Sequence, residues 1–440
     1  MAMSPEDMEK RKRRRDAQRK KQRQAQRRIR LGLAIAVVVL ALCGAAIYYF
    51  VDRIPAEPTA ETVPEETTAP TTAPTEETKS VWDPITTIHI RAAGDLNITD
   101  LVVDAGLSAN GYDYTRAFQD VASSLSSADL TLLNLEGNIC GEPYGTATSS
   151  APNKILTALR SAGVDLIQLA NSATINNGLI GLNSTLSAIR AADLEPVGAY
   201  ATPQEFRRSK GYTICDIQGI RVAFVAFTKG LGGRGMPTGN EECVNLLYKD
   251  YDSTYRSVDT ERITSILKDV KAERPDFVVA LLHWGSEYND TISSTQERIV
   301  QLLKKNGVGL IIGTHPHLVQ EIVYDEAAGT LVSYSLGDFF GDADRGGTNY
   351  SIILDVEVTR DAERGTTRVT GYSYIPIYTV TKNQSADGFH RVVRIEQAMQ
   401  AHDGNFVDRI TDACYADMQY SLTRIQARTT GADKKTDTKK

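Results

Sequence analysis

The chain has 440 residues, of which 41% are hydrophobic and 24% charged, enough for one large or two modest globular domains. A mean hydropathy of −0.27 excludes a bundle of membrane spans, and 5 cysteines in this length exclude a small disulfide-built scaffold. The net charge is −6, but charge is unevenly distributed along the chain. Residues 1–30 contain 13 Lys and Arg and 4 Asp and Glu, whereas the remaining residues contain 36 Lys and Arg and 51 Asp and Glu. The two ends of the chain therefore face different surroundings.

Residues 31–51 form an apolar segment without a charged residue. At about 1.5 Å per residue, a helix of this length spans the bilayer hydrocarbon. We predict one transmembrane helix there rather than a cleaved signal peptide, because a signal peptide has a shorter apolar region followed by a small-residue cleavage site. The basic segment 1–30 precedes the span, which predicts a cytoplasmic N-terminus and an extracellular C-terminal part. Topology explains the basic residues, and no nucleic-acid partner is expected.

Polar segments border the part of the chain that is expected to fold. Residues 52–80 are rich in Pro, Thr and Glu, a composition typical of an extended extracellular linker. Residues 428–440 are also polar, and we expect a disordered tail there. The folded domain is therefore predicted at residues 81–427.

Within this domain, short runs of β-branched residues alternate with longer helical patterns, which predicts an α/β fold with sheets covered by helices. Strands are expected at residues 87–92, 130–135, 164–169, 277–282 and 309–313. Helices are expected at residues 117–125, 154–162, 182–191, 259–273 and 295–306. Later strands at residues 331–335, 352–358 and 368–375 have no helices between them, and we expect them to form a second sheet packed on the first.

Polar residues directly follow the predicted strands. They are Asp95, Asn97, Glu136, Asn171, His283, Glu287, His315 and His317. Since chemistry in open α/β sheets gathers where strands end, we expect these side chains to converge on one rim. Taken singly, each also suits a turn or a hydrogen-bonded rim position. Together, carboxylates, carboxamides and imidazoles are the ligands of a divalent metal such as Mn, Fe, Mg or Zn.

The histidines support this interpretation. Three of the 6 histidines lie at strand ends, and two of these form a His-Pro-His segment at residues 315–317. Alternate positions can direct both imidazoles toward one centre. The other three, His89, His390 and His402, are expected to be structural.

Several motifs in this order resemble a known family. They are GD at residues 94–95, NLE at 134–136, AN at 170–171, HWGSEY at 283–288, GTHPHLVQ at 313–320 and YSLGDF at 334–339. The resemblance is to the CapA family of bacterial capsule-synthesis proteins, which is associated with poly-γ-glutamate and belongs to the calcineurin-like metallophosphoesterase superfamily. It covers residues 88–340 and implies a four-layer α/β/β/α metallophosphoesterase-like sandwich.

The resemblance also implies how a metal would be held. Asp95 and His317 would bind a first ion, Glu136 would bridge two ions, and His283 with His315 would hold the second. Asn97 stands where wider superfamily members carry a His, and is a further ligand candidate. One or two divalent ions are therefore expected, and we expect catalytic roles for His283, Glu287 and Asn171.

One motif departs from the family pattern. Where the family usually has Ala-Asn-Asn-His, this chain continues from Asn171 to Ser172 and Ala173. The missing Asn is a metal ligand in the superfamily, and the missing His is the candidate proton donor or a phosphate contact. Loss of a proton donor typically costs about 10²–10⁴-fold in rate. Asp338, where the family usually shows Asn, adds negative charge near the rim. Whether the chain is an enzyme therefore stays open.

Two further features concern the mouth of the site and the cysteines. A glycine-rich loop at residues 229–237 carries Lys229 and Arg234, which are candidates for substrate binding, with an ordinary surface loop as the alternative. Four cysteines follow the predicted span, and the sequence does not choose among their three disulfide pairings. They are Cys140, Cys215, Cys243 and Cys414.

Two functions remain open. The preferred one is a membrane-anchored extracytoplasmic protein that acts with membrane-bound capsule synthesis proteins in the synthesis or export of poly-γ-glutamate or another envelope polymer, with a metal-dependent phosphoesterase-like site. The alternative is a catalytically degenerate scaffold or polymer-binding module of the same fold. A general surface nuclease or phosphatase has no dedicated substrate signature in this sequence.

Overall fold

The computed structural model describes residues 84–407 and 409–432. These residues belong to the second of two compact units of the chain, Ser80–Lys440, which is described here by itself. The predicted basic segment, the transmembrane helix at residues 31–51 and the linker lie outside the described residues. Within the described ranges, no helix combines the length and the apolar character that a bilayer crossing requires.

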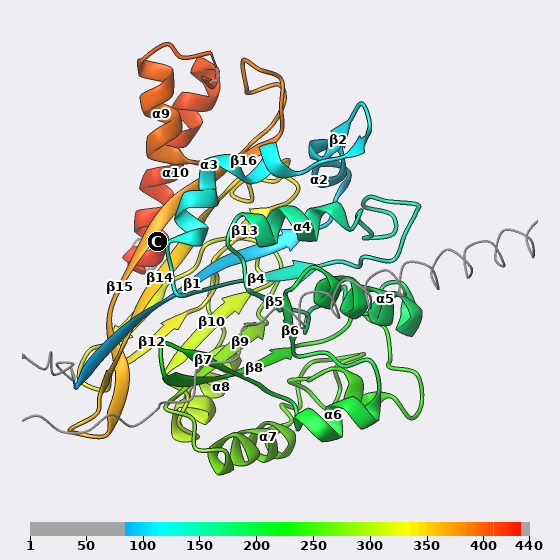
Figure 1. Ribbon diagram of the computed structural model, residues 1–440, viewed down its shortest axis with the longest axis vertical. Helices are drawn as coiled ribbons and strands as arrows, with labels where there is room; N and C mark the ends of the chain where they lie inside the picture. Colours follow the sequence, from blue (N-terminus) through cyan, green and yellow to red (C-terminus); the bar gives the residue numbers. More distant parts are fainter. Residues whose placement is uncertain (1–83, 408, 433–440) are drawn as a thin grey trace, which may run out of the picture. The chain divides into compact units, whose positions relative to one another are not determined.

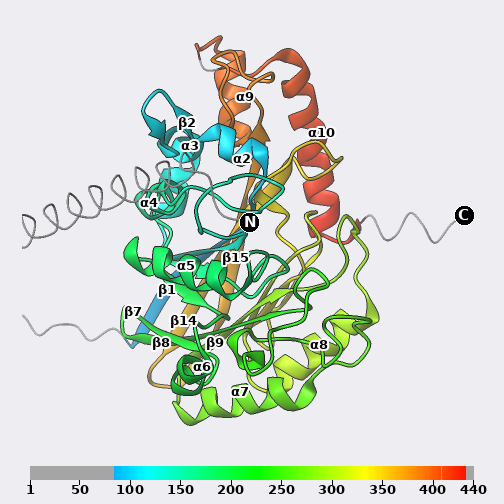
Figure 2. The same ribbon diagram turned by 90° about the vertical axis from the view of Figure 1, so that its right-hand side faces the viewer.

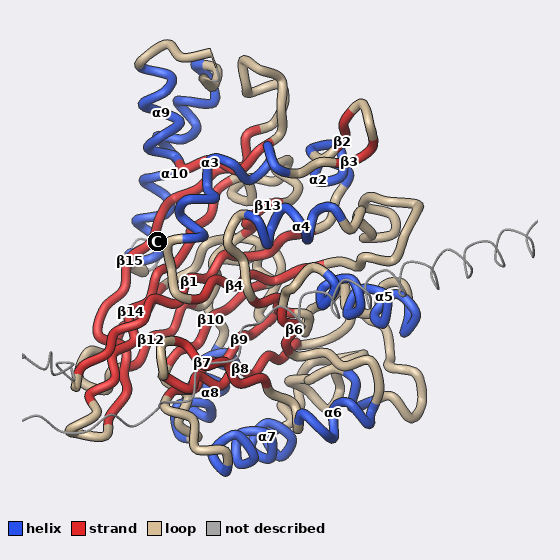
Figure 3. The backbone as a smooth tube through the Cα atoms, viewed as in Figure 1, coloured by secondary structure: helices blue, strands red, loops and turns tan. Residues whose placement is uncertain are grey.

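Two β-sheets form the centre of this unit, as Figures 1 and 3 show. The first has the strand order β16-β15-β14-β1-β4-β5-β6, with β13 also paired to β1. Its strands are β1 (Ile85–Asn97), β4 (Leu130–Glu136), β5 (Leu166–Gln168), β6 (Glu195–Val197), β13 (Asp338–Phe340), β14 (Tyr350–Asp361), β15 (Thr366–Val380) and β16 (Arg391–Arg394).

The second sheet has six strands in the order β11-β12-β10-β9-β8-β7. Its strands are β7 (Thr213–Ile217), β8 (Ile220–Thr228), β9 (Phe277–His283), β10 (Leu310–Thr314), β11 (Ile322–Asp325) and β12 (Thr330–Ser333). A small separate hairpin is formed by β2 (Leu107–Ser108) and β3 (Gly111–Tyr112).

Helices cover the outer faces of both sheets. The helices are α2 (Asp100–Ala105), α3 (Thr115–Ser126), α4 (Lys154–Ser161), α5 (Gly178–Ala191), α6 (Pro203–Ser209), α7 (Thr260–Ala272), α8 (Ser294–Lys305), α9 (Ile395–Asp403) and α10 (Asp412–Thr429). In Figure 1, α3 and α4 lie on the side of the first sheet and α7 and α8 on the side of the second. Figure 2 shows α9 and α10 at the end of the unit opposite to α7. The predicted layers of helix, sheet, sheet and helix are therefore present.

The central strands are buried on both faces. Alternate residues of β8 pack in two cores, Val222, Phe224 and Ala226 with the first sheet, and Ala223, Val225 and Phe227 with α7 and α8. A strand that is buried on both faces has a nearly continuous apolar sequence, because neither face needs polar residues. This explains why the strand regions 277–282 and 309–313 are recognisable from composition alone.

The expected origin of the second sheet was wrong for two of its three predicted strands, since only the strand predicted at residues 331–335 lies there, as β12. The strands predicted at residues 352–358 and 368–375 extend the first sheet, because β14 pairs antiparallel with β1 from Ile85 opposite Asp361 to Ala92 opposite Leu354. The second sheet is built from β7 to β12 instead. A hairpin's apolar pattern shows that it needs a partner strand but does not specify which one.

The predicted disordered tail was placed too early. Helix α10 continues to Thr429, and the side chains of Arg428 and Thr429 are only 9% and 4% exposed. Met418, Ser421 and Ile425 are buried at helical spacing along the same helix. This buried face continues past the expected boundary at residue 427, so the polar composition of residues 428–432 concealed the end of a packed helix.

The four described cysteines are free thiols, so none of the three disulfide pairings is formed. Burial raises the pKa of Cys215 to about 11 and that of Cys414 to about 12. Both thiols are therefore protonated at neutral pH and are weak nucleophiles.

Candidate metal centre

The two sheets bring the ends of four strands together. In the first sheet, β1 and β4 run parallel with Asp95 opposite Asn134 and Asn97 opposite Glu136. In the second sheet, β9 ends at His283 opposite Thr314, the last residue of β10. The carboxylates therefore come from one sheet and the imidazoles from the other.

The His-Pro-His segment follows β10 in a left-handed conformation rather than an extended one. The backbone φ angles are 93° at His315 and 59° at His317. Conformations of this kind in residues other than glycine cost about 1–3 kcal/mol each and are retained where the surrounding structure requires them. Here the turn allows the His315 backbone N–H to donate to Asp95 Oδ2 at 2.9 Å.

Five predicted ligand residues lie together with Asp338 in three overlapping groups. In each group, one possible ligand atom per residue lies within 4.8 Å of the others. The groups are Asp95, Glu136 and His283; Glu136, His315 and His317; and Asp95, His317 and Asp338. All six residues are buried. Asp95, Glu136 and His317 each belong to two groups, so the cluster has room for more than one mode of ligation.

Close contacts connect Glu136 with imidazoles on two sides. His283 Nε2 lies 3.4 Å from Glu136 Oε1, and His317 Nε2 lies 3.9 Å from Glu136 Oε2. The ring centroids of His283 and His315 are 4.5 Å apart. The side chain of Glu136 is therefore at the centre of the cluster, where the resemblance implied a bridging carboxylate.

Three buried polar atoms of the cluster have no hydrogen-bond partner within the described residues: Glu136 Oε2, His283 Nε2 and His315 Nδ1. Leaving a buried polar atom unpaired costs about 1–3 kcal/mol. Carboxylate oxygens and imidazole nitrogens are ligands of divalent metals, so one or two bound ions would supply the missing partners. The residues present therefore fit a divalent metal.

The two central carboxylates differ in their acidity. Burial raises the pKa of Asp95, and the neighbouring charge of Glu136 raises it further. Burial also tends to raise the pKa of Glu136, but the imidazoles of His283 and His317 have the larger effect and hold this pKa below its usual range. Two buried carboxylates this close require positive charge nearby if both are to be ionised.

The two histidines of the His-Pro-His segment also differ. Burial and the nearby imidazole of His283 hold the pKa of His315 well below its usual value, which leaves a neutral ring suited to metal ligation. Burial tends to lower the pKa of His317, but the Asp338 carboxylate has the larger effect and raises this pKa well above its usual value. His317 Nδ1 lies 2.7 Å from Asp338 Oδ1, and burial raises the pKa of Asp338 to about 7. Asp338 thereby fixes the orientation of the His317 ring.

Two supporting residues of the cluster were not predicted. Asn134 Nδ2 donates to Asp95 Oδ1 at 2.6 Å, and Thr314 Oγ1 lies 3.2 Å from His283 Nδ1. Hydrogen bonds of this kind orient ligand side chains. The signal for Asn134 is its position two residues before Glu136, which places both side chains on the same face of β4.

The segment that departs from the family pattern adjoins the cluster. Asn171 Nδ2 donates to Asn134 Oδ1 at 3.0 Å, and Asn171 Oδ1 accepts from the Ala173 backbone N–H at 3.0 Å. Asn171 is thus positioned to support Asn134, and its catalytic role stays a prediction. The Ser172 hydroxyl donates to Glu136 Oε1. Ala173 is buried and contributes no polar side-chain atom.

The remaining predicted site residues lie around the cluster. Lys229 Nζ donates to the Gly285 carbonyl at 2.6 Å, and Arg234 Nη1 donates to Asn176 Oδ1 at 2.8 Å. Burial lowers the pKa of Lys229, and Glu287 is exposed. Among the described residues, no side-chain hydrogen bond joins Lys229, Arg234 or Glu287 to the cluster, and their roles stay predictions. The same holds for Asn97, which lies in register with Glu136.

Comparisons with known sequences match the folded part of the chain. A family model described as bacterial capsule synthesis protein PGA_cap matches residues 89–343. The capsule biosynthesis protein CapA of Bacillus anthracis is 30% identical over 241 residues, which cover 53% of this chain and 55% of that protein. The PGA biosynthesis protein CapA of Bacillus subtilis (strain 168) is 26% identical over 185 residues, covering 42% and 44%. The chain therefore spans about half the length of these curated relatives.

Matches among solved structures are more distant in sequence. The calcineurin-like phosphoesterase YfkN from Bacillus subtilis has 18% sequence identity and a TM-score of 0.39, with 67% of this chain and 91% of that chain covered. A phosphatase from Mycoplasma pneumoniae has 14% identity and a TM-score of 0.40, with 67% and 94% covered. Similarity at this level carries no conclusion about the activity of this chain.

Proposed function

The chain belongs to the family of bacterial capsule synthesis proteins, PGA_cap, and from this premise we propose that it acts in the synthesis or export of a capsule polymer. The polymer is poly-γ-glutamate or another envelope polymer. The names of the Bacillus relatives support this assignment. In this proposal residues 31–51 anchor the protein in the membrane, the folded domain is extracellular, and its partners are membrane-bound capsule synthesis proteins.

We further propose that the buried cluster holds one or two divalent ions and forms a phosphoesterase-like site. The observation that supports this is the clustering of Glu136, His283 and His315, whose Oε2, Nε2 and Nδ1 atoms are buried and have no hydrogen-bond partner among the described residues. A bound divalent ion supplies Lewis-acid activation of a phosphoryl or carbonyl oxygen. Asn134 holds Asp95 in place, and Asp338 holds His317 with its Nε2 toward Glu136.

Metal analysis of the purified full-length protein tests this site. We expect the parent protein to retain Mn, Fe, Mg or Zn after dialysis, and His315→Ala to lose most of it, because the variant removes a buried neutral ligand. His89→Ala is the matched control, since His89 is bound to Asp355 at 2.9 Å and lies outside the cluster. A parent protein that binds none of these metals would contradict the proposal.

The second candidate function is a catalytically degenerate scaffold or polymer-binding module. Two residues favour it. The Ser172 hydroxyl donates a hydrogen bond to Glu136 Oε1, and Ala173 has no side-chain group that could donate a proton. The double variant Ser172→Asn/Ala173→His restores the usual family residues at both positions. If the parent is inactive on phosphoesters and poly-γ-glutamate and the double variant gains hydrolysis, the scaffold function is supported. An active parent protein would contradict it.

A further inference from the structure

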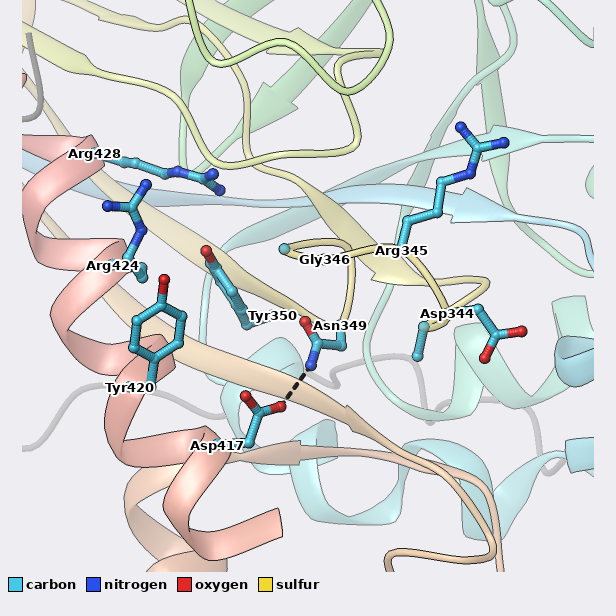
Figure 4. A pocket seen from close by; sticks show the side chains of 11 residues that line it. Asp344, Arg345, Gly346, Asn349, Tyr350, Asp417, Tyr420, Arg424 and Arg428 are labelled. Carbon is cyan, nitrogen blue, oxygen red and sulfur yellow. Dashed lines mark hydrogen bonds between the residues drawn. The ribbon is translucent and has the colours of Figure 1, made fainter. Parts of the chain in front are cut away.

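A second polar pocket lies outside the metal cluster, between the loop at residues 343–349 and helix α10 (Figure 4). Its volume is about 410 Å³. Three arginines and two aspartates are among its lining residues, Arg345, Arg424, Arg428, Asp344 and Asp417. None of the cluster residues lines this pocket, so it is a separate site.

Arg428 is the main feature of the pocket. Its side chain is only 9% exposed, yet within the described residues its Nε and Nη1 have no hydrogen-bond partner. Its Nη2 lies 3.6 Å from Asp290 Oδ2. A buried guanidinium with unmade hydrogen bonds is unfavourable for the fold. This indicates a ligand that supplies the missing acceptors.

Other donors gather around the Arg428 guanidinium. Figure 4 shows it extending from α10 over Tyr350, with the polar ends of Arg424 and Tyr420 on the same side. The guanidinium carbon of Arg428 lies 5.7 Å from the centroid of the Tyr350 ring. Tyr420, Arg424 and Arg428 are spaced four residues apart on α10 and therefore share a helix face. Guanidinium and phenol groups together are a donor set for an oxyanion.

The charges of the pocket favour a monoanion. Asp417 is already engaged, because it accepts from Asn349 Nδ2 at 2.8 Å and from the Tyr378 hydroxyl at 2.5 Å. Figure 4 shows Asp344 turned away from Arg428. Counted with Asp290, which lies 3.6 Å from Arg428, three aspartates balance the three arginines, so the surroundings of Arg428 carry no excess of positive charge. Such surroundings suit one carboxylate better than a phosphate that carries nearly two negative charges.

The loop that lines the pocket also reaches the metal cluster. The guanidinium carbon of Arg345 lies 4.0 Å from the centroid of the Tyr288 ring, and that ring stacks on His317 at 5.3 Å. The same loop follows β13, which carries Asp338. The loop that lines the pocket is therefore connected to the cluster through the Tyr288 ring.

We propose that the pocket of Arg424, Arg428 and Tyr350 binds a carboxylate of an acidic polypeptide polymer and holds that polymer beside the metal cluster. The inference depends on the proposed function for the nature of the polymer, but not on metal binding or catalysis. The pocket is a binding site in this proposal, and no chemical step takes place in it.

The test is binding of fluorescein-labelled poly-γ-glutamate to the full-length protein, measured by fluorescence anisotropy with EDTA present. Arg428→Met is expected to weaken binding about tenfold or more, because a buried charged donor set is lost. Arg428→Lys keeps the charge but not the planar donor array, so an intermediate loss is expected. Arg364→Met removes an exposed arginine between β14 and β15 and is the matched control, with affinity unchanged.

Thermal unfolding separates binding from folding. Arg428→Met should melt at or above the parent temperature, because it removes a buried and incompletely paired charge. If that variant does not fold, Arg424→Gln provides the same test at the neighbouring arginine of the same helix face. Unchanged polymer affinity in a folded pocket variant would overturn the proposal.

Competitors and chelation separate the remaining outcomes. Stronger competition by inorganic phosphate or polyglycerol phosphate than by unlabelled poly-γ-glutamate would identify a phosphate site and overturn the proposal. Loss of all polymer binding in EDTA would place the contact at the metal cluster and would also overturn the proposal. Binding that persists in EDTA and falls in Arg428→Met supports the pocket, even if metal analysis contradicts the proposed metal site.

Discussion

At the residue scale, Asp338 shows how one carboxylate prepares another side chain for ligation. Its Oδ1 lies 2.7 Å from His317 Nδ1, which leaves the Nε2 of that ring facing Glu136. Metal-binding histidines commonly have a carboxylate at the second nitrogen, and removing it typically reduces metal affinity by about 10–100-fold. The pairing of β13 with β1 places Asp338 opposite Asp95.

We therefore predict that Asp338→Ala lowers metal affinity by about 10–100-fold. Asp338→Asn, which restores the residue usual in the family and keeps a carbonyl acceptor for His317, should lose less. Competition between the full-length protein and a fluorescent chelator for Zn or Mn measures both values. Equal affinities of Asp338→Ala and the parent protein would show that the Asp338 contact does not support metal binding.

The contribution of single residues also shows what sequence can predict about the site. Asp95, Glu136, His283, His315 and His317 stand at the ends of recognisable strands, and the structure brings their side chains together. Asn134 and Thr314 become partners of these residues only through the register of β1 with β4 and of β9 with β10. Register between distant strands depends on the whole sheet, so local patterns do not reveal it.

At the element scale, one ion-pair network joins α3 to the connection between β15 and β16. Asp387 accepts from Arg391 Nη1 at 2.7 Å and from Arg116 Nη2 at 2.8 Å, and Arg391 is only 3% exposed. Burial acts upward on the pKa of Asp387, but the Ser385 hydroxyl and the Arg391 guanidinium outweigh it and lower the pKa. The folded state therefore favours the ionised carboxylate.

The lowered pKa gives a pH dependence with a defined sign. The stabilisation by Asp387 is fully present above the unfolded-state pKa of about 3.9 and is lost as the pH falls through the lower folded-state value. Asp387→Asn should therefore reduce the free energy of unfolding at pH 7 by about 1–3 kcal/mol, and by less below pH 4. Urea unfolding at both pH values measures this. Asp193→Asn, whose side chain is 91% exposed, is the control and should show little change at either pH.

Elements differ in how much of them the sequence predicts. The strand predicted at residues 277–282 is β9 (Phe277–His283), because a continuous apolar run ends there at polar residues. Helix α5 begins at Gly178, four residues before the predicted start at residue 182. Ile180 lies in its first turn and is 86% exposed. An apolar residue on the solvent side disturbs the helical pattern that a prediction relies on. The partners of β14 and β15 depend on contacts far along the chain.

At the scale of the whole molecule, the charge of the part predicted to be extracellular affects which polymer it can bind. The 36 basic and 51 acidic residues after position 30 make the predicted extracellular part acidic. Long-range repulsion then opposes the capture of an acidic polymer. A polymer of that kind would have to be bound by local groups such as those of the Arg428 pocket.

The predicted topology is tested by limited proteolysis of cells from which the wall has been removed. Trypsin is expected to cut after Arg53 or Lys79, the basic residues between the predicted span and β1, and to release the folded domain without lysis. The double variant Arg53→Gln/Lys79→Gln should prevent this release. Fragments that form only after lysis would contradict an extracellular domain.

The division of the metal cluster between the two sheets has a mechanical consequence. Asp95 and Glu136 belong to the first sheet, whereas His283 ends strand β9 of the second and the His-Pro-His turn follows strand β10 of the second. An ion held by both sets would cross-link the two halves of the sandwich, and its removal would loosen the seam between them. Calorimetry should then show a melting temperature that rises with metal concentration, by an amount equivalent to about 2.7 kcal/mol at a hundredfold excess over Kd.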